Sequence, residues 1–153
     1  VGTGCLIGLP DQSVESLAED ILFFREIDAD MIGIGPFIPN EDTPLKDKIG
    51  GDFITSIKVM ALIRLLMPDI NIPATTAMES LVSDGRQIAL QSGANVVMPN
   101  VTEGVYRKLY ALYPGKICTG DTPVQCRRCI TEKINSIGRS ISNSKGFRIK
   151  STV

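Results

Sequence analysis

The fold is decided by the stretch Asp30-Met31-Ile32-Gly33-Ile34-Gly35-Pro36-Phe37. It is a short, nearly continuous apolar run that ends in a long loop containing two prolines, a pattern typical of a strand buried on both faces. Similar runs occur at 3–9, 72–77 and 94–99, and each is followed by a loop and then by an amphipathic helical pattern. Strands of this kind that alternate with helices predict a parallel sheet covered by helices.

The helices are predicted from their periodicity and their caps. Ser13 is a suitable N-cap for a helix that runs to about Phe24, and Asp52 is a suitable cap for a helix over 53–67. Shorter helical patterns cover about 84–92, ending at Gly93, and about 102–112. After residue 114 glycine, proline, cysteine and basic residues dominate, and one further helix is expected at about 125–137.

Four strand–helix units fit either half of an eight-fold barrel or an open doubly wound sheet. We favour the barrel because no helix is opened by G-x-G-x-x-G or by a P-loop. The predicted fold is therefore α/β, the C-terminal half of a (β/α)8 TIM-type barrel, with four units in 1–113. Residues 114–153 are predicted to form a C-terminal extension, in which the polar and basic segment 138–153 either packs over the barrel mouth or forms a partly mobile tail.

The first residue, Val1, lies at the head of an apolar strand, so we expect a fragment whose missing part lies upstream. Half a barrel leaves two sheet edges unpaired, and we expect such a fragment to self-associate.

The bulk composition excludes several function classes. The 153 residues carry 16 basic and 17 acidic side chains. This balance lacks the excess of positive charge that binding to nucleic acid or to an anionic membrane requires. The sequence contains no apolar run long enough to span a membrane and no secretory signal, which predicts a cytoplasmic protein. Histidine is absent, so histidine-based acid–base catalysis and histidine-ligated metals are excluded. Chemistry would then depend on a cofactor or on the missing half.

Three of the four cysteines, Cys118, Cys126 and Cys129, form a C-x7-C-x2-C pattern. Three thiolates without histidine suit an iron–sulfur cluster better than structural zinc, which needs a fourth ligand. The alternative is three free thiols. Cys5, within the first strand, is expected to be a small buried residue.

Active sites of parallel barrels form at the C-terminal ends of the strands, which makes those residues the candidates for binding. Thr75 and Thr76 place two hydroxyl groups at one such end, although threonine also suits a strand and a turn. Gly33 and Gly35 leave room for a close approach to the backbone, or for a bulge. Met98 ends the fourth strand, where methionine is more often a core residue.

Five segments together resemble one family of proteins. They are 2–12, 30–39, 71–78, 93–100 and 113–118, and they resemble, in order and spacing, HydE-type radical S-adenosylmethionine maturases of (FeFe)-hydrogenase. Biotin synthase and methylornithine synthase are similar more loosely.

The resemblance implies a barrel enzyme that binds S-adenosylmethionine on a (4Fe–4S) cluster. The three cluster cysteines, spaced C-x3-C-x2-C, are not in this chain and would belong to the upstream half. It implies S-adenosylmethionine contacts at Leu6, Gly8, Gly33, Ile34, Gly35 and Pro36. Substrate contacts are implied at Thr75, Thr76, Met98 and Tyr113.

The same resemblance matches Cys118, Cys126 and Cys129 to an accessory iron–sulfur cluster, 2Fe–2S or 4Fe–4S, that some members carry. It implies a small-molecule or iron-bearing precursor as substrate and other hydrogenase maturases as partners. The chain departs from the family at Asn40, where histidine is common, and at Cys5, where a smaller polar residue is common.

Two alternatives stay open. One is a radical S-adenosylmethionine enzyme with another substrate, of the biotin synthase or methylornithine synthase kind. The other is a half-barrel without catalytic activity that serves as a binding module. The fragment alone is expected to be inactive under the leading hypothesis, because it lacks the cluster motif.

Overall fold

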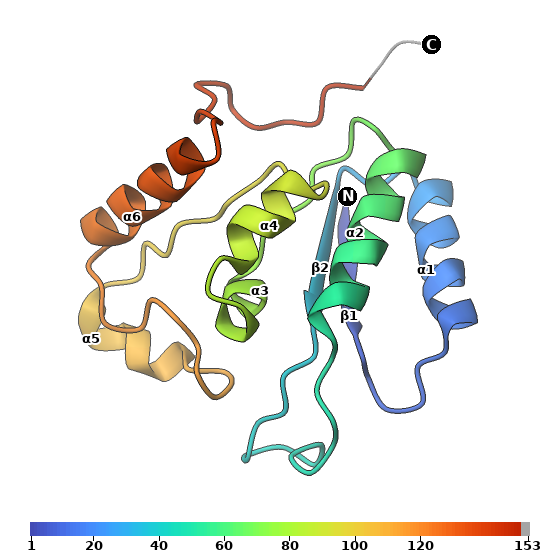
Figure 1. Ribbon diagram of the computed structural model, residues 1–153, viewed down its shortest axis with the longest axis horizontal. Coiled ribbons are helices and arrows are strands. Elements are labelled where there is room, and N and C mark those ends of the chain that lie inside the picture. Colours follow the sequence, from blue (N-terminus) through green and yellow to red (C-terminus); the bar gives the residue numbers. More distant parts are fainter. Residues whose placement is uncertain (151–153) are drawn as a thin grey trace.

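The computed structural model describes residues 1–150. It is a mixed α/β structure in which a small parallel sheet lies beside a layer of helices (Figure 1). The elements, in chain order, are β1 (Gly2–Ile7), α1 (Val14–Glu26), β2 (Met31–Pro36), α2 (Phe53–Leu66), α3 (Thr76–Leu81), α4 (Gly85–Gln91), α5 (Gly104–Arg107), the 3₁₀ helix η1 (Lys108–Tyr110) and α6 (Pro123–Ser136).

The sheet contains two regular strands and two further extended segments. β1 and β2 pair in parallel over six residues, with Gly4 opposite Gly33 and Leu6 opposite Gly35. The third and fourth predicted strands are reduced to single parallel bridges, between Met31 and Asn71 and between Pro73 and Val96. The expected parallel order is therefore present, but two of its four members are too short to count as strands.

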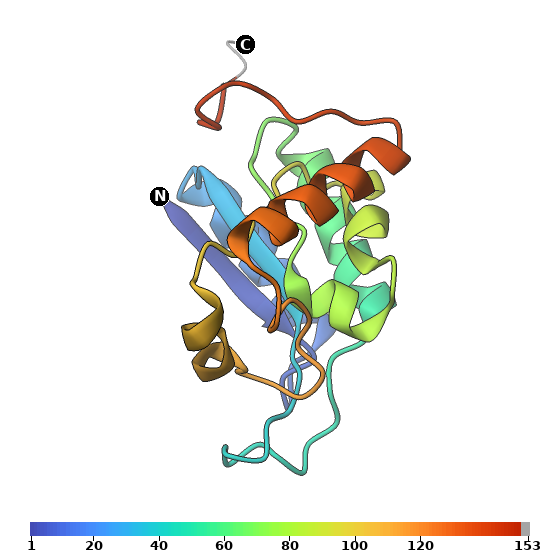
Figure 2. The ribbon, with the colours of Figure 1, turned by 90° about the vertical axis from the view of Figure 1, so that its left-hand side faces the viewer.

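The hydrophobic core lies on one face of these segments. Ile7, Ile32 and Ile34 are buried there with Ile72 from the third segment. Helix α2 covers this face together with α1 and α4, whereas α5 and η1 lie on the other side of the strands (Figure 2). In β1 and β2 the face opposite the core carries Gly2, Gly4 and Leu6 opposite Met31, Gly33 and Gly35, so most of its positions lack a side chain.

Two helix caps predicted from the sequence are confirmed. The Ser13 hydroxyl accepts a hydrogen bond from the backbone N–H of Ser16 at 3.1 Å, and α1 begins at Val14, the residue after Ser13. The Asp52 carboxylate accepts from the N–H of Thr55 at 2.6 Å at the start of α2. The prediction of one helix over 102–112 is wrong, because only the short helices α5 and η1 form there, and together they span seven residues.

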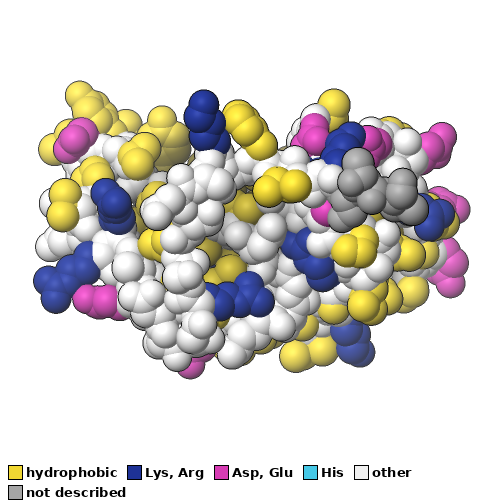
Figure 3. Space-filling model, turned by 90° about the horizontal axis from the view of Figure 1, so that it is seen from above, with side chains coloured by type: hydrophobic (Ala, Val, Ile, Leu, Met, Phe, Trp, Pro, Cys, Tyr) yellow, Lys and Arg dark blue, Asp and Glu magenta, His cyan; other side chains and the backbone are white. Residues whose placement is uncertain are grey.

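The described part of the C-terminal extension crosses the N-terminal ends of the strands. The Arg148 guanidinium pairs with Asp28 at 2.7 Å and with Asp69 at 2.8 Å, and it also donates to the Ala29 carbonyl. The Asn71 amide donates to the Gly146 carbonyl. The expectation that this segment covers the barrel mouth is thus wrong, because these contacts hold it at the opposite end. Figure 3 looks onto that end, where basic and acidic side chains are interspersed.

Residues 1–150 contain no helix with the length and apolar character that a membrane span requires.

Gly51 is expected to tolerate no side chain. A Cβ there would lie 1.9 Å from the Ile7 carbonyl oxygen, because the end of the loop after β2 packs directly on the end of β1. We expect Gly51→Ala to lower the free energy of unfolding by about 1–3 kcal/mol, measured by urea denaturation. Gly104→Ala is the matched control, since a Cβ at Gly104 meets nothing within 4 Å. Equal midpoints for both variants would contradict the close packing.

Candidate functional site

Four residues from four different segments lie level with one another on the open face. Leu6 is opposite Gly35 in the β1–β2 register. Continuing the register from the Met31–Asn71 bridge brings Gly35 level with Thr75, and continuing from the Pro73–Val96 bridge brings Thr75 level with Met98. The contact between the second and third segments is close, because a Cβ on Gly35 would lie 3.0 Å from the Thr75 hydroxyl oxygen. The four C-terminal ends thus form one row.

Two hydroxyl groups stand beside this row with different partners. The Thr75 oxygen is buried and has no hydrogen-bond partner among the residues that the structure describes, although Thr75 occupies the N-cap position of α3. The Thr76 oxygen lies 2.9 Å from the Tyr113 hydroxyl, in a hydrogen bond that spans 37 residues. An unsatisfied buried hydroxyl costs free energy, so a ligand that donates to or accepts from Thr75 would recover it.

Of the four residues predicted to contact the substrate, the structure brings Thr75, Thr76 and Tyr113 close together. It leaves Met98 further out. Thr76 and Tyr113 share a hydrogen bond, and Thr75 directly precedes Thr76 in the chain. Met98 lies in the same row but is 61% exposed, on the outer segment of the four. It is therefore not the buried core residue that methionine usually is at a strand end.

The six residues predicted to contact S-adenosylmethionine do not share one face. Leu6, which is 48% exposed, lies with Gly33 and Gly35 on the open side of the strands. Ile34 points the other way and is fully buried in the core, because successive side chains of a strand alternate. The Ile34 side chain is thus not placed to contact a ligand on the open face. Pro36 is also buried.

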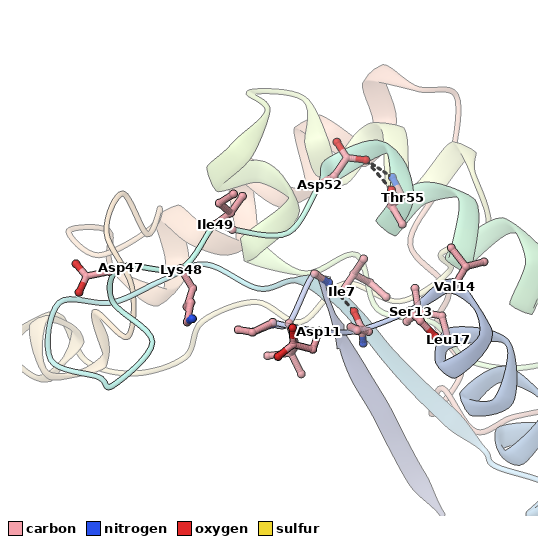
Figure 4. A pocket seen from close by; sticks show the side chains of 15 residues that line it. Ile7, Asp11, Ser13, Val14, Leu17, Asp47, Lys48, Ile49, Asp52 and Thr55 are labelled. Atoms are coloured by element: carbon pink, nitrogen blue, oxygen red, sulfur yellow. Dashed lines mark hydrogen bonds between the residues drawn. The ribbon is translucent and has the colours of Figure 1, made fainter.

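Gly8 lies at the edge of a separate hollow of about 630 Å³ on the helix side of β1. Figure 4 shows Ser13, Val14 and Leu17 of the α1 side facing Asp52 and Thr55 of the α2 side across it. Two of its polar side chains already have partners: Asp52 accepts from Thr55, and the Gln12 side chain bridges the Gly8 N–H and the Leu6 carbonyl. The lining also includes the charged side chains of Asp11, Asp47 and Lys48.

The cysteine triplet is not gathered into a site. Cys126 is 2% exposed, and its sulfur accepts from the N–H of Asn100 at 3.3 Å. Cys129, one helical turn further along α6, is exposed. Among residues 1–150 no group of three or more potential ligands is placed to hold a metal ion. The predicted accessory cluster at Cys118, Cys126 and Cys129 is thus not supported.

Cys118 belongs instead to a polar network that the sequence did not reveal. Its sulfur lies 3.6 Å from Nη2 of Arg86, and its carbonyl accepts from Arg107. Arg86 forms a 2.8 Å ion pair with Glu79, which also pairs with Lys133 of α6. Burial raises the pKa of the Cys118 thiol above its ordinary value, and the neighbouring Arg86 opposes that shift. No sequence motif marked Glu79, Arg86 or Arg107, because their role depends on contacts distant in the chain.

The thiols are expected to differ in reactivity. Burial, and then the nearby Asp20 carboxylate, raise the pKa of Cys5 from 9.0 to about 11. At pH 8 only about one Cys5 thiol in a thousand is ionised, so iodoacetamide should modify the exposed Cys129 well before Cys5. Peptide mass spectrometry over time measures this order, and a faster reaction at Cys5 would contradict the burial.

The raised pKa of Cys5 also makes a prediction about alkaline pH. Above pH 9 the unfolded chain loses this proton while the folded chain keeps it until about pH 11. The stability that the protonated thiol preserves is therefore complete below pH 9 and falls as the pH rises toward 11. Cys5→Ala should reduce that part of the alkaline loss of stability in denaturant titrations.

Comparison with known protein families identifies the family to which this chain belongs. Residues 33–130 match the model of the Biotin and Thiamin Synthesis associated domain. The chain belongs to this domain family. The matched region contains most of β2, the segments around Thr75 and Met98, Tyr113 and most of α6, and it excludes β1.

Curated relatives of the domain agree with the resemblance seen in the sequence. The chain is 50% identical over 147 residues to the [FeFe] hydrogenase maturase subunit HydE of Thermotoga maritima, covering 96% of this chain and 42% of that protein. It is 32% identical over 94 residues to 3-methylornithine synthase of Methanosarcina acetivorans, covering 61% and 26%. It is 28% identical over 92 residues to biotin synthase of Chlorobium limicola, covering 60% and 27%.

The predicted resemblance to HydE is therefore confirmed. The chain spans less than half the length of each of these relatives.

Proposed function

We propose that this chain supplies the C-terminal half of a (β/α)8 barrel in a radical S-adenosylmethionine enzyme that matures the active-site di-iron cluster of (FeFe)-hydrogenase. The observation that carries the proposal is the 50% identity to HydE over nearly the whole chain. The local structure supports it: the four segments are parallel, follow one another in chain order, and are covered by helices on the core face. A barrel half has this arrangement, and its C-terminal strand ends carry the site.

The open face of β1 and β2 fits a cofactor that lies against the backbone. Gly4 and Gly33 are opposite each other, and a Cβ on Gly4 would lie 2.1 Å from the Gly33 carbonyl oxygen. Gly35, opposite Leu6, is itself buried against Thr75, so the more accessible backbone of this face is that of Gly4 and Gly33. We propose that Leu6, Gly33 and Gly35 bind S-adenosylmethionine, with Gly8 fixing the end of β1. When bound to an iron–sulfur cluster supplied by the rest of the barrel, S-adenosylmethionine provides a 5′-deoxyadenosyl radical.

The hydroxyl groups of Thr75, Thr76 and Tyr113 are proposed to bind the substrate. Hydroxyl groups donate and accept hydrogen bonds, so together they suit a small polar or anionic group, including one carried by an iron-bearing precursor. Within residues 1–150 the buried Thr75 hydroxyl has no hydrogen-bond partner, whereas Tyr113 holds that of Thr76. These side chains would orient the substrate beside the cofactor face, because Thr75 is level with Gly35. Other hydrogenase maturases in the cytoplasm would deliver or receive this precursor.

A related enzyme with another substrate is the second candidate. The 3-methylornithine synthases of two Methanosarcina species match about 60% of the chain at 31–32% identity. HydE is favoured because its match extends over 96% of the chain at higher identity.

A chimaera tests the proposed function. This chain would replace the matching C-terminal 42% of Thermotoga HydE, and the chimaera would be expressed with an (FeFe)-hydrogenase in a host that lacks its own HydE. We expect active hydrogenase from the chimaera and none from the HydE portion without this chain. A chimaera that folds, carries its cluster and yields no active hydrogenase would contradict the proposal. Formation of 3-methylornithine by the same chimaera would favour the second candidate.

A further inference from the structure

Two loops that are distant in the sequence meet at one hydrogen bond. The side-chain amide of Asn40, in the loop after β2, donates to the carbonyl of Leu112 at 2.7 Å across 72 residues. Leu112 is in the segment that follows η1, and its side chain is 63% exposed. Because that segment buries little apolar surface here, a single hydrogen bond contributes much of what fixes its position.

The Asn40 side chain is held in place on its own loop. Its Oδ1 accepts from the N–H of Asp42 at 3.0 Å, and its carbonyl accepts from Thr43 at 2.8 Å. The first of these bonds is that of an Asx turn, and it leaves the Nδ2 group directed at the distant carbonyl. Both polar atoms of the Asn40 side chain are therefore in use, one locally and one across the two loops.

The residue after Leu112 is Tyr113, the partner of Thr76. Its hydroxyl lies 2.9 Å from the Thr76 oxygen, and Nζ of Lys116 lies 5.7 Å from the centre of its ring. Lys116 also donates to the Tyr110 carbonyl, so it belongs to the same segment and moves with it. Asn40 is thus the contact that ties the backbone beside Tyr113 to the β2 loop. A hollow of about 520 Å³ lined by Asn40, Tyr113 and Lys116 lies between the two loops.

We propose that Asn40 is a positioning residue: by holding the Leu112 carbonyl it fixes the Tyr113 hydroxyl against Thr76, and so sets the geometry of the substrate site. The inference rests on the proposed function for what the site binds, but the positioning itself is a property of this chain. Asn40 does not touch the substrate in this account. It acts through the backbone of one residue and the side chain of the next.

Asn40→Asp separates the two bonds of the side chain. Aspartate keeps the oxygen that accepts from Asp42 and loses the N–H₂ group that donates to Leu112. Thr43→Val is the matched control, because it removes a bond to the Asn40 carbonyl and leaves the link between the loops intact. Any general loosening of the β2 loop should appear in both variants, whereas loss of positioning should appear only in Asn40→Asp.

The first readout is the NMR signal of the ring carbon Cζ of Tyr113 in the full chain, which has three tyrosines to assign. Thr76→Val defines the shift that follows loss of the Thr76–Tyr113 bond, and Tyr113→Phe assigns the signal. We expect Asn40→Asp to move the Tyr113 signal in the direction seen for Thr76→Val, with Tyr106 and the Thr43→Val control unchanged. A Tyr113 signal unmoved in Asn40→Asp would overturn the inference, as would an equal shift in Thr43→Val.

The second readout is hydrogenase maturation by the chimaera. Asn40→Asp should lower the yield of active hydrogenase by about three- to tenfold, the effect of one weakened hydrogen bond, with S-adenosylmethionine cleavage unchanged. Asn40→His, which keeps a ring N–H donor, should restore part of that yield. If the parent chimaera is inactive, the proposed function fails while the NMR result still decides the positioning. An Asn40→Asp chimaera with full yield would overturn the link to the site.

Discussion

Replacing Glu79 with glutamine is expected to lower the free energy of unfolding by about 3 kcal/mol, because it leaves a buried cation unpaired. Glu79 lies in α3 with its side chain 6% exposed, and it pairs with Arg86 of α4, whose side chain is 5% exposed. Lys133 of α6 pairs with the other carboxylate oxygen. One carboxylate therefore joins three helices, and its charge compensates a guanidinium that has little access to water. Urea denaturation measures the change.

Glu132→Gln is the matched control for this prediction. Glu132 accepts from Arg128 at 2.9 Å on the exposed side of α6, where both side chains are well hydrated, so its loss should leave the denaturation midpoint almost unchanged. The double variant Glu79→Leu with Arg86→Met should recover much of the lost stability, since it removes the buried guanidinium together with its partner, and the Lys133 side chain that loses the carboxylate is 31% exposed to water. A Glu79→Gln variant as stable as the control would show that the buried network does not hold the helices together.

Replacing both strand-end threonines with valine is expected to reduce hydrogenase maturation by the chimaera by about 100-fold. Thr75→Val with Thr76→Val keeps the shape of each side chain and removes two hydroxyl groups. Each hydrogen bond to a charged group contributes about 1.5–3 kcal/mol, and even the lower figure for both gives about that factor. S-adenosylmethionine cleavage should continue, because the glycines of the proposed cofactor face are unchanged. The yield of active hydrogenase relative to 5′-deoxyadenosine formed is the measurement.

Thr131→Val controls for the loss of a threonine hydroxyl elsewhere in the chain. The Thr131 hydroxyl donates to the Arg127 carbonyl within α6, remote from the row of strand ends, and its loss should leave maturation unchanged. Equal losses of maturation and of S-adenosylmethionine cleavage in the double variant would place the threonines in the cofactor site. Full maturation in the double variant would show that the Thr75 and Thr76 hydroxyl groups do not bind the substrate.

Local signals in the sequence were sufficient to predict the first part of the fold, from β1 to α2. The cap residues Ser13 and Asp52 act through the next few residues, so spacing alone located the starts of α1 and α2. The pairing of β1 with β2 followed from two apolar runs joined by one helix. The threonine pair was identified by its place at a strand end, which is also a local feature.

The predictions from sequence that the structure contradicts concern segments whose position depends on contacts distant in the chain. The helix expected at 102–112 is broken into α5 and η1, where the Arg107 guanidinium is buried among the carbonyls of Asn100, Thr102 and Cys118. The C-x7-C-x2-C pattern predicted shared ligation, but the fold buries Cys126 and exposes Cys129. Sequence spacing carried no information on Arg148, whose partners Asp28 and Asp69 precede it by 120 and 79 residues.

The most direct test of the central claim is reductive cleavage of S-adenosylmethionine by the chimaera, followed as 5′-deoxyadenosine under anaerobic conditions. If this chain completes the barrel and its open glycine face binds the cofactor, the chimaera should form 5′-deoxyadenosine, and the HydE portion without this chain should not. A folded chimaera with an intact (4Fe–4S) cluster and no 5′-deoxyadenosine would contradict the account.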